Sequence, residues 1–423
     1  MNSFEFFILF SEKWTSYIVP LLIIFPLFCI VTKKISSSWF NSLRFVTMTA
    51  FIGYTSILFL YVEGYVLLKD FVYLLFAISI FWITFCSIYK NKQRKVSLLV
   101  KNEKGIAKYL FYACFLLYIF LTLFTYKTLG IPIFNENSRL ATFTGSGLGF
   151  IERLTPILRG YSLFYIVHIL ISHKALYTRV LFASYLIPVI IFGVLSGSRS
   201  SFMLVIMAFW GYKTFYCRDE PKISNYKIFI CFFVLISVVT FTINEYGNFS
   251  MGILRFAQRI IACGDLYWTS LPNEMWKDVE VENSFNMTFV GLLGPMRLMK
   301  DYQIPIGFQL THLVNPGYDL STGPVALFPL FSLICYGYVG GLFMCFIQAL
   351  LASKILSMSF VYSNSLIISA LCFYVYTTSV TFLGDIKNAL GSLFDMAFGI
   401  TVFLFIAVGA AVVCNLKNRV NVI

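Results

Sequence analysis

The chain has 423 residues, of which 59% are hydrophobic and 12% are charged, and its formal net charge is +13 at pH 7. A soluble domain is nearer half apolar and a quarter charged, so this composition excludes an ordinary globular protein, and a disordered chain would lack such apolar surface. Apolar runs of about 18 residues or more, long enough to cross a bilayer, recur along the sequence. Because lipid offers no partner to free backbone groups, we expect these runs to be helices of an all-α integral membrane protein.

Eleven membrane spans are expected, joined mostly by short loops. Their approximate ranges are 16–32, 44–61, 69–89, 109–129, 156–172, 180–196, 201–217, 228–243, 323–351, 361–383 and 393–414. Met1–Trp14 lacks a basic start and carries two glutamates, so no cleavable signal is expected. The loops assigned to the cytoplasm hold most of the Lys and Arg residues and few of the acids, which places the N-terminus outside and the C-terminus inside. The basic excess therefore indicates topology, and no nucleic-acid partner is expected.

Two outer segments are long within what we expect to be a single polytopic membrane domain, 1–423. The first periplasmic loop is expected over 130–155, and a large periplasmic loop with short helices over 244–322. Loops of this length in a compact protein usually carry function, and a transporter bundle would not need the second one. Among the cysteines only Cys263 falls in the large loop, so no disulfide framework is expected there.

Arginine is abundant on the predicted outer side, and its planar guanidinium matches the paired oxygens of phosphates. The outer arginines are Arg139, Arg153, Arg159, Arg199, Arg255, Arg259 and Arg297. Arg199 lies in a hairpin between two apolar spans, where a charge is unfavourable unless it is paired or ligated. Arg255 and Arg259 share one face of a predicted amphipathic helix, where an anion between them would relieve their repulsion. We expect these four residues, Arg139 included, to bind phosphate groups. Contact with lipid headgroups is the alternative function for Arg199 and for this helix.

Four residues are candidates for a catalytic base on the outer side. His312 is the only histidine there, and a histidine titrates near neutral pH. The acids Glu136, Asp265 and Asp319 are rival bases, and an incidental loop histidine is the alternative for His312. The sequence shows no metal-ligand cluster and no nucleotide-binding loop, so neither a metal nor another cofactor is expected.

Several of these segments occur in an order that resembles a known family. Ile131-Pro132-Ile133-Phe134 precedes Arg139 and a glycine cluster, and Gly197-Ser198-Arg199-Ser200 follows. Then come Gly264-Asp265-Leu266-Tyr267 and, in a later span, Tyr336-Gly337-Tyr338-Val339-Gly340. Over about 120–350 the chain is similar to the Wzy-type oligosaccharide repeat-unit polymerases of O-antigen and capsule synthesis. It departs from them at Val325–Phe331, which lacks the Arg-His pair common in the family, so the identity of the base stays open.

The resemblance implies a metal-independent glycosyltransferase of the bacterial inner membrane. Its substrates would be oligosaccharides linked to undecaprenyl diphosphate, and a growing glycan would be transferred onto a fresh lipid-linked repeat unit at the periplasmic face. Membrane lipids and a chain-length regulator protein are the partners it suggests. Two alternatives stay open: an O-antigen ligase, which would transfer glycan to a lipid A core, and a non-enzymatic flippase of lipid-linked oligosaccharides.

Overall fold

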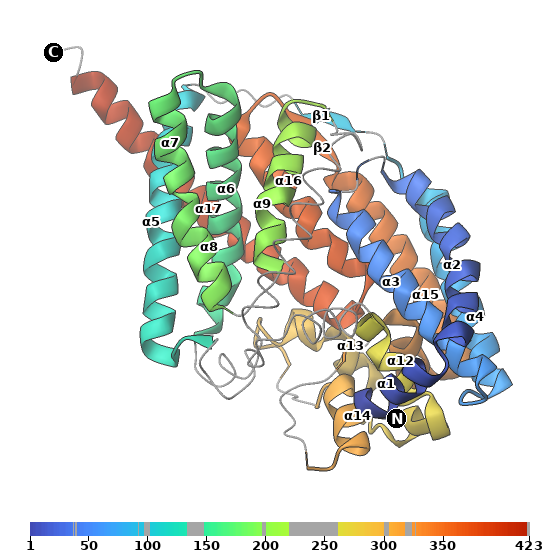
Figure 1. Ribbon diagram of the computed structural model, residues 1–423. Helices are drawn as coiled ribbons and strands as arrows, with labels where there is room; N and C mark the ends of the chain where they lie inside the picture. The colour runs from blue at the N-terminus through green and yellow to red at the C-terminus, as the bar shows by residue number, and fades with distance from the viewer. Residues whose placement is uncertain are drawn as a thin grey trace. The chain divides into compact units, whose positions relative to one another are not determined.

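The computed structural model describes residues 1–36, 38, 40–91, 93–96, 102–132, 148–196, 200–219, 261–299, 304–317, 324–325 and 327–420, which are mostly helical. The chain divides into two compact units, each built from segments distant in sequence (Figure 1). Unit 1 comprises Met1–Asn91, Lys222–Ser357 and Ser379–Leu393. Unit 2 comprises Lys92–Pro221, Met358–Thr378 and Phe394–Ile423.

Unit 1 begins with four helices and continues with a series of short ones. The first four are α1 (Ser3–Glu12), α2 (Trp14–Ile35), α3 (Ser42–Val62) and α4 (Leu68–Ile88). The short pieces are η4 (Ala262–Gly264), α12 (Asp265–Ser270), η5 (Pro272–Asp278), α13 (Ser284–Leu293) and α14 (Ile306–Val314). Most of α15 (Phe328–Ser359), then η6 (Val380–Leu383) and the start of α17 (Ile386–Val420), complete the unit. Short helices therefore occur in the described part of 244–322, and that this segment is a periplasmic loop stays a prediction.

Unit 2 contains most of the remaining helices and a small sheet. Its elements are β1 (Arg94–Val96), α5 (Glu103–Leu129), α6 (Gly149–Ser172), α7 (Leu176–Ser184), α8 (Leu186–Leu195), α9 (Ser200–Gly211), η2 (Tyr212–Tyr216), β2 (Val361–Ser363), α16 (Leu366–Ser379) and the rest of α17. β1 and β2 pair in parallel with Lys95 opposite Tyr362. Next to this pair, the Glu103 carboxylate accepts hydrogen bonds from the Ser365 hydroxyl at 2.7 Å and the Ile367 N–H at 3.2 Å, which joins the start of α5 to the start of α16.

Nine helices in the described residues are long and apolar enough to cross a membrane, as expected of a multi-pass, mainly α-helical membrane protein. They match nine of the eleven predicted spans. The predicted span 201–217 is covered by α9 and the π-helix η2, and neither helix alone is long enough to cross a membrane. The predicted span 228–243 lies outside the described residues.

The helix α15 is a hairpin, so the predicted span 323–351 is not one continuous helix. Its backbone breaks at Gly337, where φ is 68° and ψ is −171°, a conformation open to glycine and costly for other residues. The Cys345 thiol lies 3.9 Å from the carbonyl oxygen of Phe328. In a straight helix these two residues would be about 25 Å apart. The arm before Gly337 therefore runs back along the arm after it, and Tyr338–Ser359 is the arm long enough to cross a bilayer.

Aromatic side chains hold the short helices of unit 1 against its membrane helices. Phe6 of α1 stacks on Trp268 of α12 with ring centroids 4.0 Å apart, and it meets Phe59 of α3 edge-on at 6.0 Å. All three side chains are buried. Large aromatic surfaces give the greatest burial per side chain, so this core fixes α12 beside α3.

The topology of unit 1 gives a first prediction. The Nζ of Lys69, in the first turn of α4, lies 2.7 Å from the Glu274 carboxylate of η5, so η5 lies at that end of α4. The distribution of basic residues predicts that this end lies outside. We therefore expect a phosphatase reporter inserted near Asp278 to be active outside the cytoplasm, and a fluorescent reporter fused after Lys104 to be cytoplasmic. A cytoplasmic readout at Asp278 would show that the predicted orientation is wrong, and the candidate sites of unit 1 would then face the cytoplasm.

Candidate functional site

Two of the eight residues predicted for the site lie in the described part of the structure. Asp265 and His312 both belong to unit 1. The other six lie outside the described residues, and their roles stay predictions: Glu136, Arg139, Arg199, Arg255, Arg259 and Asp319.

Asp265 is the first residue of α12, in a segment buried among the helices of unit 1. Every side chain in the range 266–271 is buried, and α12 packs on α1 and α3. The preceding turn meets α3 near its middle, since a Cβ added to Gly53 would lie 2.7 Å from the Cys263 carbonyl oxygen. At 1.5 Å per residue, Gly53 is about 14 Å from the end of α3 at Val62. The segment around Asp265 therefore lies within the length of α3 rather than beyond its end.

Burial controls the acidity of Asp265. It raises the pKa of the carboxyl from 3.8 to about 7, although the Leu266 N–H donates to its Oδ1 at 2.8 Å and opposes that rise. Burial, reinforced by the charge of Asp265, also raises the pKa of the Cys263 thiol to about 11, so this thiol stays protonated at neutral pH. A carboxyl that titrates near neutrality can take up and release a proton under physiological conditions. Asp265 therefore has the acidity of a general base.

His312 lies on α14, which packs against α12. The structure thus brings together the two helices that carry the two described candidate bases. The side chain of His312 is exposed, whereas that of Asp265 is half-buried. No hydrogen bond joins these two side chains in the described structure, so they do not form a catalytic pair of the His-Asp kind.

Unit 2 contains a cavity of about 230 Å³ between α6, α9 and α16. Its lining residues are Pro156, Arg159, Gly160, Leu163, Leu204, Met207, Ala208, Phe373, Tyr374, Thr377 and Thr378. Among them Arg159 alone is charged, and Tyr374, Thr377 and Thr378 add hydroxyl groups to mostly apolar walls. Arg159 lies about 15 Å along α6 from Gly149, and it interacts with the hydroxyl of Tyr118 on α5. An apolar cavity with one fixed guanidinium suits an amphiphile with an anionic group.

A second arginine of α6 has a structural role. The Nε of Arg153 lies 3.3 Å from the Asp395 carboxylate of α17, and its guanidinium stands 5.1 Å from the centre of the Phe394 ring. Both charged side chains are about one-third exposed, so the pair contributes about 1 kcal/mol or less. Arg153 therefore joins α6 to α17.

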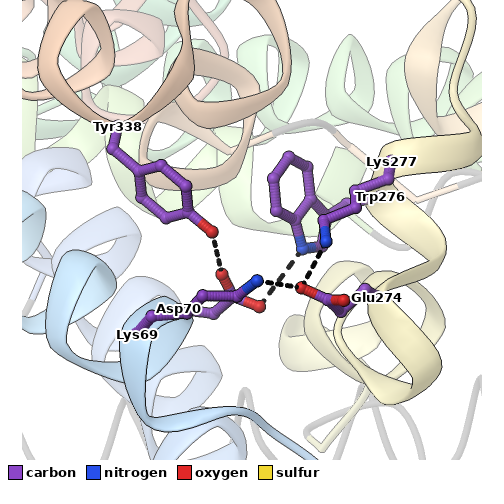
Figure 2. Close-up of polar contacts among 6 residues, drawn as sticks. All are labelled: Lys69, Asp70, Glu274, Trp276, Lys277 and Tyr338. Carbon is purple, nitrogen blue, oxygen red and sulfur yellow. Dashed lines mark hydrogen bonds and ion pairs between the residues drawn. The ribbon is translucent and has the colours of Figure 1, made fainter.

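A fully buried carboxylate marks another polar site, in unit 1. Asp70, in the first turn of α4, is 0% exposed. Its Oδ1 accepts a hydrogen bond from the Tyr338 hydroxyl at 2.6 Å, and its Oδ2 accepts a longer one from the Trp276 indole N–H at 3.4 Å (Figure 2). Tyr338 directly follows the corner of the α15 hairpin, and Trp276 belongs to η5. Asp70 therefore holds together three segments that are far apart in sequence.

Two lysines and a glutamate surround this carboxylate. Glu274 lies 2.7 Å from the Nζ of Lys69 and 2.7 Å from the Nζ of Lys277. The lysine side chains are about half exposed. We call the whole group the Trp276 cluster; it comprises Lys69, Asp70, Glu274, Trp276, Lys277 and Tyr338 (Figure 2).

Comparison of the chain with known protein families, with curated proteins and with solved structures finds no match. The functional assignment therefore rests on the chemistry of these sites and on the order of the sequence motifs.

The sequence indicated neither the cavity nor the Trp276 cluster. Asp70 could have been singled out as an acid at the start of an apolar run, since such a residue needs partners. Its partners could not, because Trp276 and Tyr338 are 206 and 268 positions away along the chain. For the cavity, the signal was the polar pair Thr377-Thr378 inside an apolar helix, a weak pattern without its neighbours in space.

Proposed function

We propose that the chain is a polymerase of lipid-linked oligosaccharides in the inner membrane of a bacterium. It would transfer a growing glycan from undecaprenyl diphosphate onto the repeat unit of a second lipid-linked substrate, at the periplasmic face. The observation that supports this most directly is the cavity of unit 2, where α6, α9 and α16 line a mostly apolar space with Arg159 in its wall. A polyprenyl chain suits such walls, and a diphosphate suits a planar guanidinium.

The reaction divides into charge stabilisation and proton transfer. The bond between the anomeric carbon and the diphosphate oxygen breaks, and the same carbon bonds to a hydroxyl oxygen of the acceptor sugar. The leaving diphosphate gains negative charge, which arginines would stabilise, and the sequence predicts Arg139, Arg199, Arg255 and Arg259 for this role. The proton of the acceptor hydroxyl would pass to a base, for which Asp265 is one candidate because its pKa is about 7.

Deletion of the gene tests this proposal in a strain whose surface polysaccharide is built from repeat units. We expect the mutant to carry surface lipid bearing a single repeat unit, because transfer and export of one unit continue while elongation stops. Gel banding of the surface polysaccharide measures the outcome, and expression from a plasmid should restore the ladder.

Two other banding results would contradict a polymerase. Long polymer that stays on the carrier and never reaches the surface lipid would indicate a ligase. Repeat units trapped on the inner face of the membrane would indicate a flippase. A complete ladder in the deletion strain would exclude all three functions.

A further inference from the structure

The Trp276 cluster holds its indole ring in a fixed orientation. The ring N–H donates to Asp70, and Tyr338 meets the ring at right angles with centroids 6.0 Å apart. The side chain of Trp276 is nevertheless only half-buried. Tyr338 brings the only other aromatic ring in contact with this indole in the described structure. Trp276 therefore offers a partly exposed aromatic surface. Because its side chain is already held in place, little conformational entropy is lost when a ligand binds.

The backbone that presents Trp276 is strained. Asn273 and Glu274 are consecutive and both left-handed, with φ of 56° and 55°, although neither is a glycine. Such a pair persists only where the surrounding contacts hold it, and strained residues gather at ligand sites more than elsewhere. Here the ion pairs of Glu274 with Lys69 and Lys277 supply those contacts. In this conformation Glu274 contacts Lys69 of α4, and the Trp276 N–H donates to Asp70.

The charges of the cluster limit the class of ligand. Lys69 and Lys277 are positive, Asp70 and Glu274 are negative, and their formal charges cancel. The Nζ of Lys277 lies 5.7 Å from the centre of the indole ring, so a cationic ligand would meet repulsion there. An anionic ligand would compete with Glu274 for both lysines. The site therefore favours a neutral ligand with an apolar face and polar edges.

We propose that the Trp276 cluster binds a neutral carbohydrate. One face of a sugar ring carries C–H groups that would stack on the indole, and its hydroxyls would reach the polar side chains at the rim. Those side chains are Lys277 with the exposed Asn273 and Asp278. The rim thus offers both donors and acceptors, as a polyhydroxyl ligand needs. Within the proposed function, on which this assignment to the acceptor glycan rests, the cluster would hold the repeat unit that receives the growing chain.

Calorimetric titration of the purified full-length protein in detergent tests this site. The probe is the mixture of lipid-free oligosaccharides released by mild acid from the surface polysaccharide of the source cells. We expect Trp276→Ala to weaken binding at least ten-fold and Trp276→Phe, which keeps a ring, to weaken it less than five-fold. Trp14→Ala is the matched control, because Trp14 is 55% exposed on α2 of the same unit, and it should bind like the native chain.

Three results would overturn the proposal. Binding by Trp276→Ala equal to that of Trp14→Ala would show that the indole does not contact the sugar. Equal weakening by Trp276→Phe and Trp276→Ala would assign the effect to the N–H contact with Asp70 rather than to the ring. Displacement of the oligosaccharide by inorganic diphosphate would mark the cluster as an anion site.

A chemical probe covers the case in which Trp276→Ala does not fold. N-bromosuccinimide oxidises accessible indoles, and peptide mass mapping separates Trp276 from Trp14. Saturating oligosaccharide should slow oxidation of Trp276 in the native chain and leave Trp14 unchanged; equal rates at Trp276 with and without sugar would refute the site. These binding results are independent of the deletion phenotype. If sugar protects Trp276 but deletion of the gene leaves a full ladder, the carbohydrate site is supported and the polymerase function is refuted.

Discussion

Replacing Arg159 by alanine is expected to slow polymer elongation about 10²–10³-fold, the usual effect of removing one group that stabilises charge in a transition state. The reason is its place in the wall of the unit 2 cavity, where it is the charged lining residue among apolar side chains and three hydroxyls. Arg159→Lys should also be impaired, because an ammonium keeps the charge but loses the planar pair of donors. Elongation of radiolabelled lipid-linked repeat units by isolated membranes measures the rate.

The control for Arg159 is an arginine of the same unit outside the cavity. Arg179 on α7 is exposed, and Arg179→Ala should elongate at the native rate with the protein at its normal level in the membrane. Native activity in Arg159→Ala would show that the cavity does not bind the donor diphosphate. In that case Arg199→Ala should show the loss instead, since Arg199 is the strongest of the arginines predicted from sequence.

The positions of the membrane helices could be predicted because the length of an apolar run is a direct consequence of bilayer thickness. The hairpin of α15 could not be predicted in this way, since the apolar run continues across Gly337 without interruption. Run length does not distinguish a long straight helix from two arms that fold back on each other. The positive φ of Gly337 and the close approach of the arms at Gly341, where a Cβ would lie 2.9 Å from the Ser332 carbonyl oxygen, appear only in three dimensions.

The candidate site was predictable only in part, for a similar reason. Charge and residue type indicated Asp265 among several acids on the outer side, but its burial beside α3 distinguishes it. That burial follows from the packing of Phe6 and Phe59 with Trp268, residues scattered over the chain. The spacing of apolar residues within one helix does not show which residues of distant helices that helix contacts.

Asp265→Asn is expected to lower elongation at neutral pH about 10²–10⁴-fold if its carboxylate accepts the proton of the acceptor hydroxyl. The native rate should rise about ten-fold per pH unit below pH 7 and level off above it, because only the deprotonated form is a base and its pKa is about 7. Rates of elongation by isolated membranes between pH 5 and pH 9 give this profile. In the same assay His312→Gln should keep the native profile; loss of the pH dependence in His312→Gln would assign the base to the exposed histidine instead.

The pH dependence of stability separates a catalytic from a structural Asp265. Its folded pKa is raised above the ordinary value of 3.8, so the folded protein retains this proton where the unfolded chain has lost it. The resulting stabilisation is complete below about pH 4 and is lost as the pH rises through 7. Burial raises the pKa of Asp385 to about 6, so this carboxyl adds a similar pH dependence of stability that ends near pH 6.

Asp265→Asn and Asp385→Asn should both make the melting temperature in detergent depend less on pH, but only Asp265→Asn should also stop elongation. Normal elongation by Asp265→Asn with a flattened stability profile would make this acid structural and leave His312, Glu136 and Asp319 as the candidate bases.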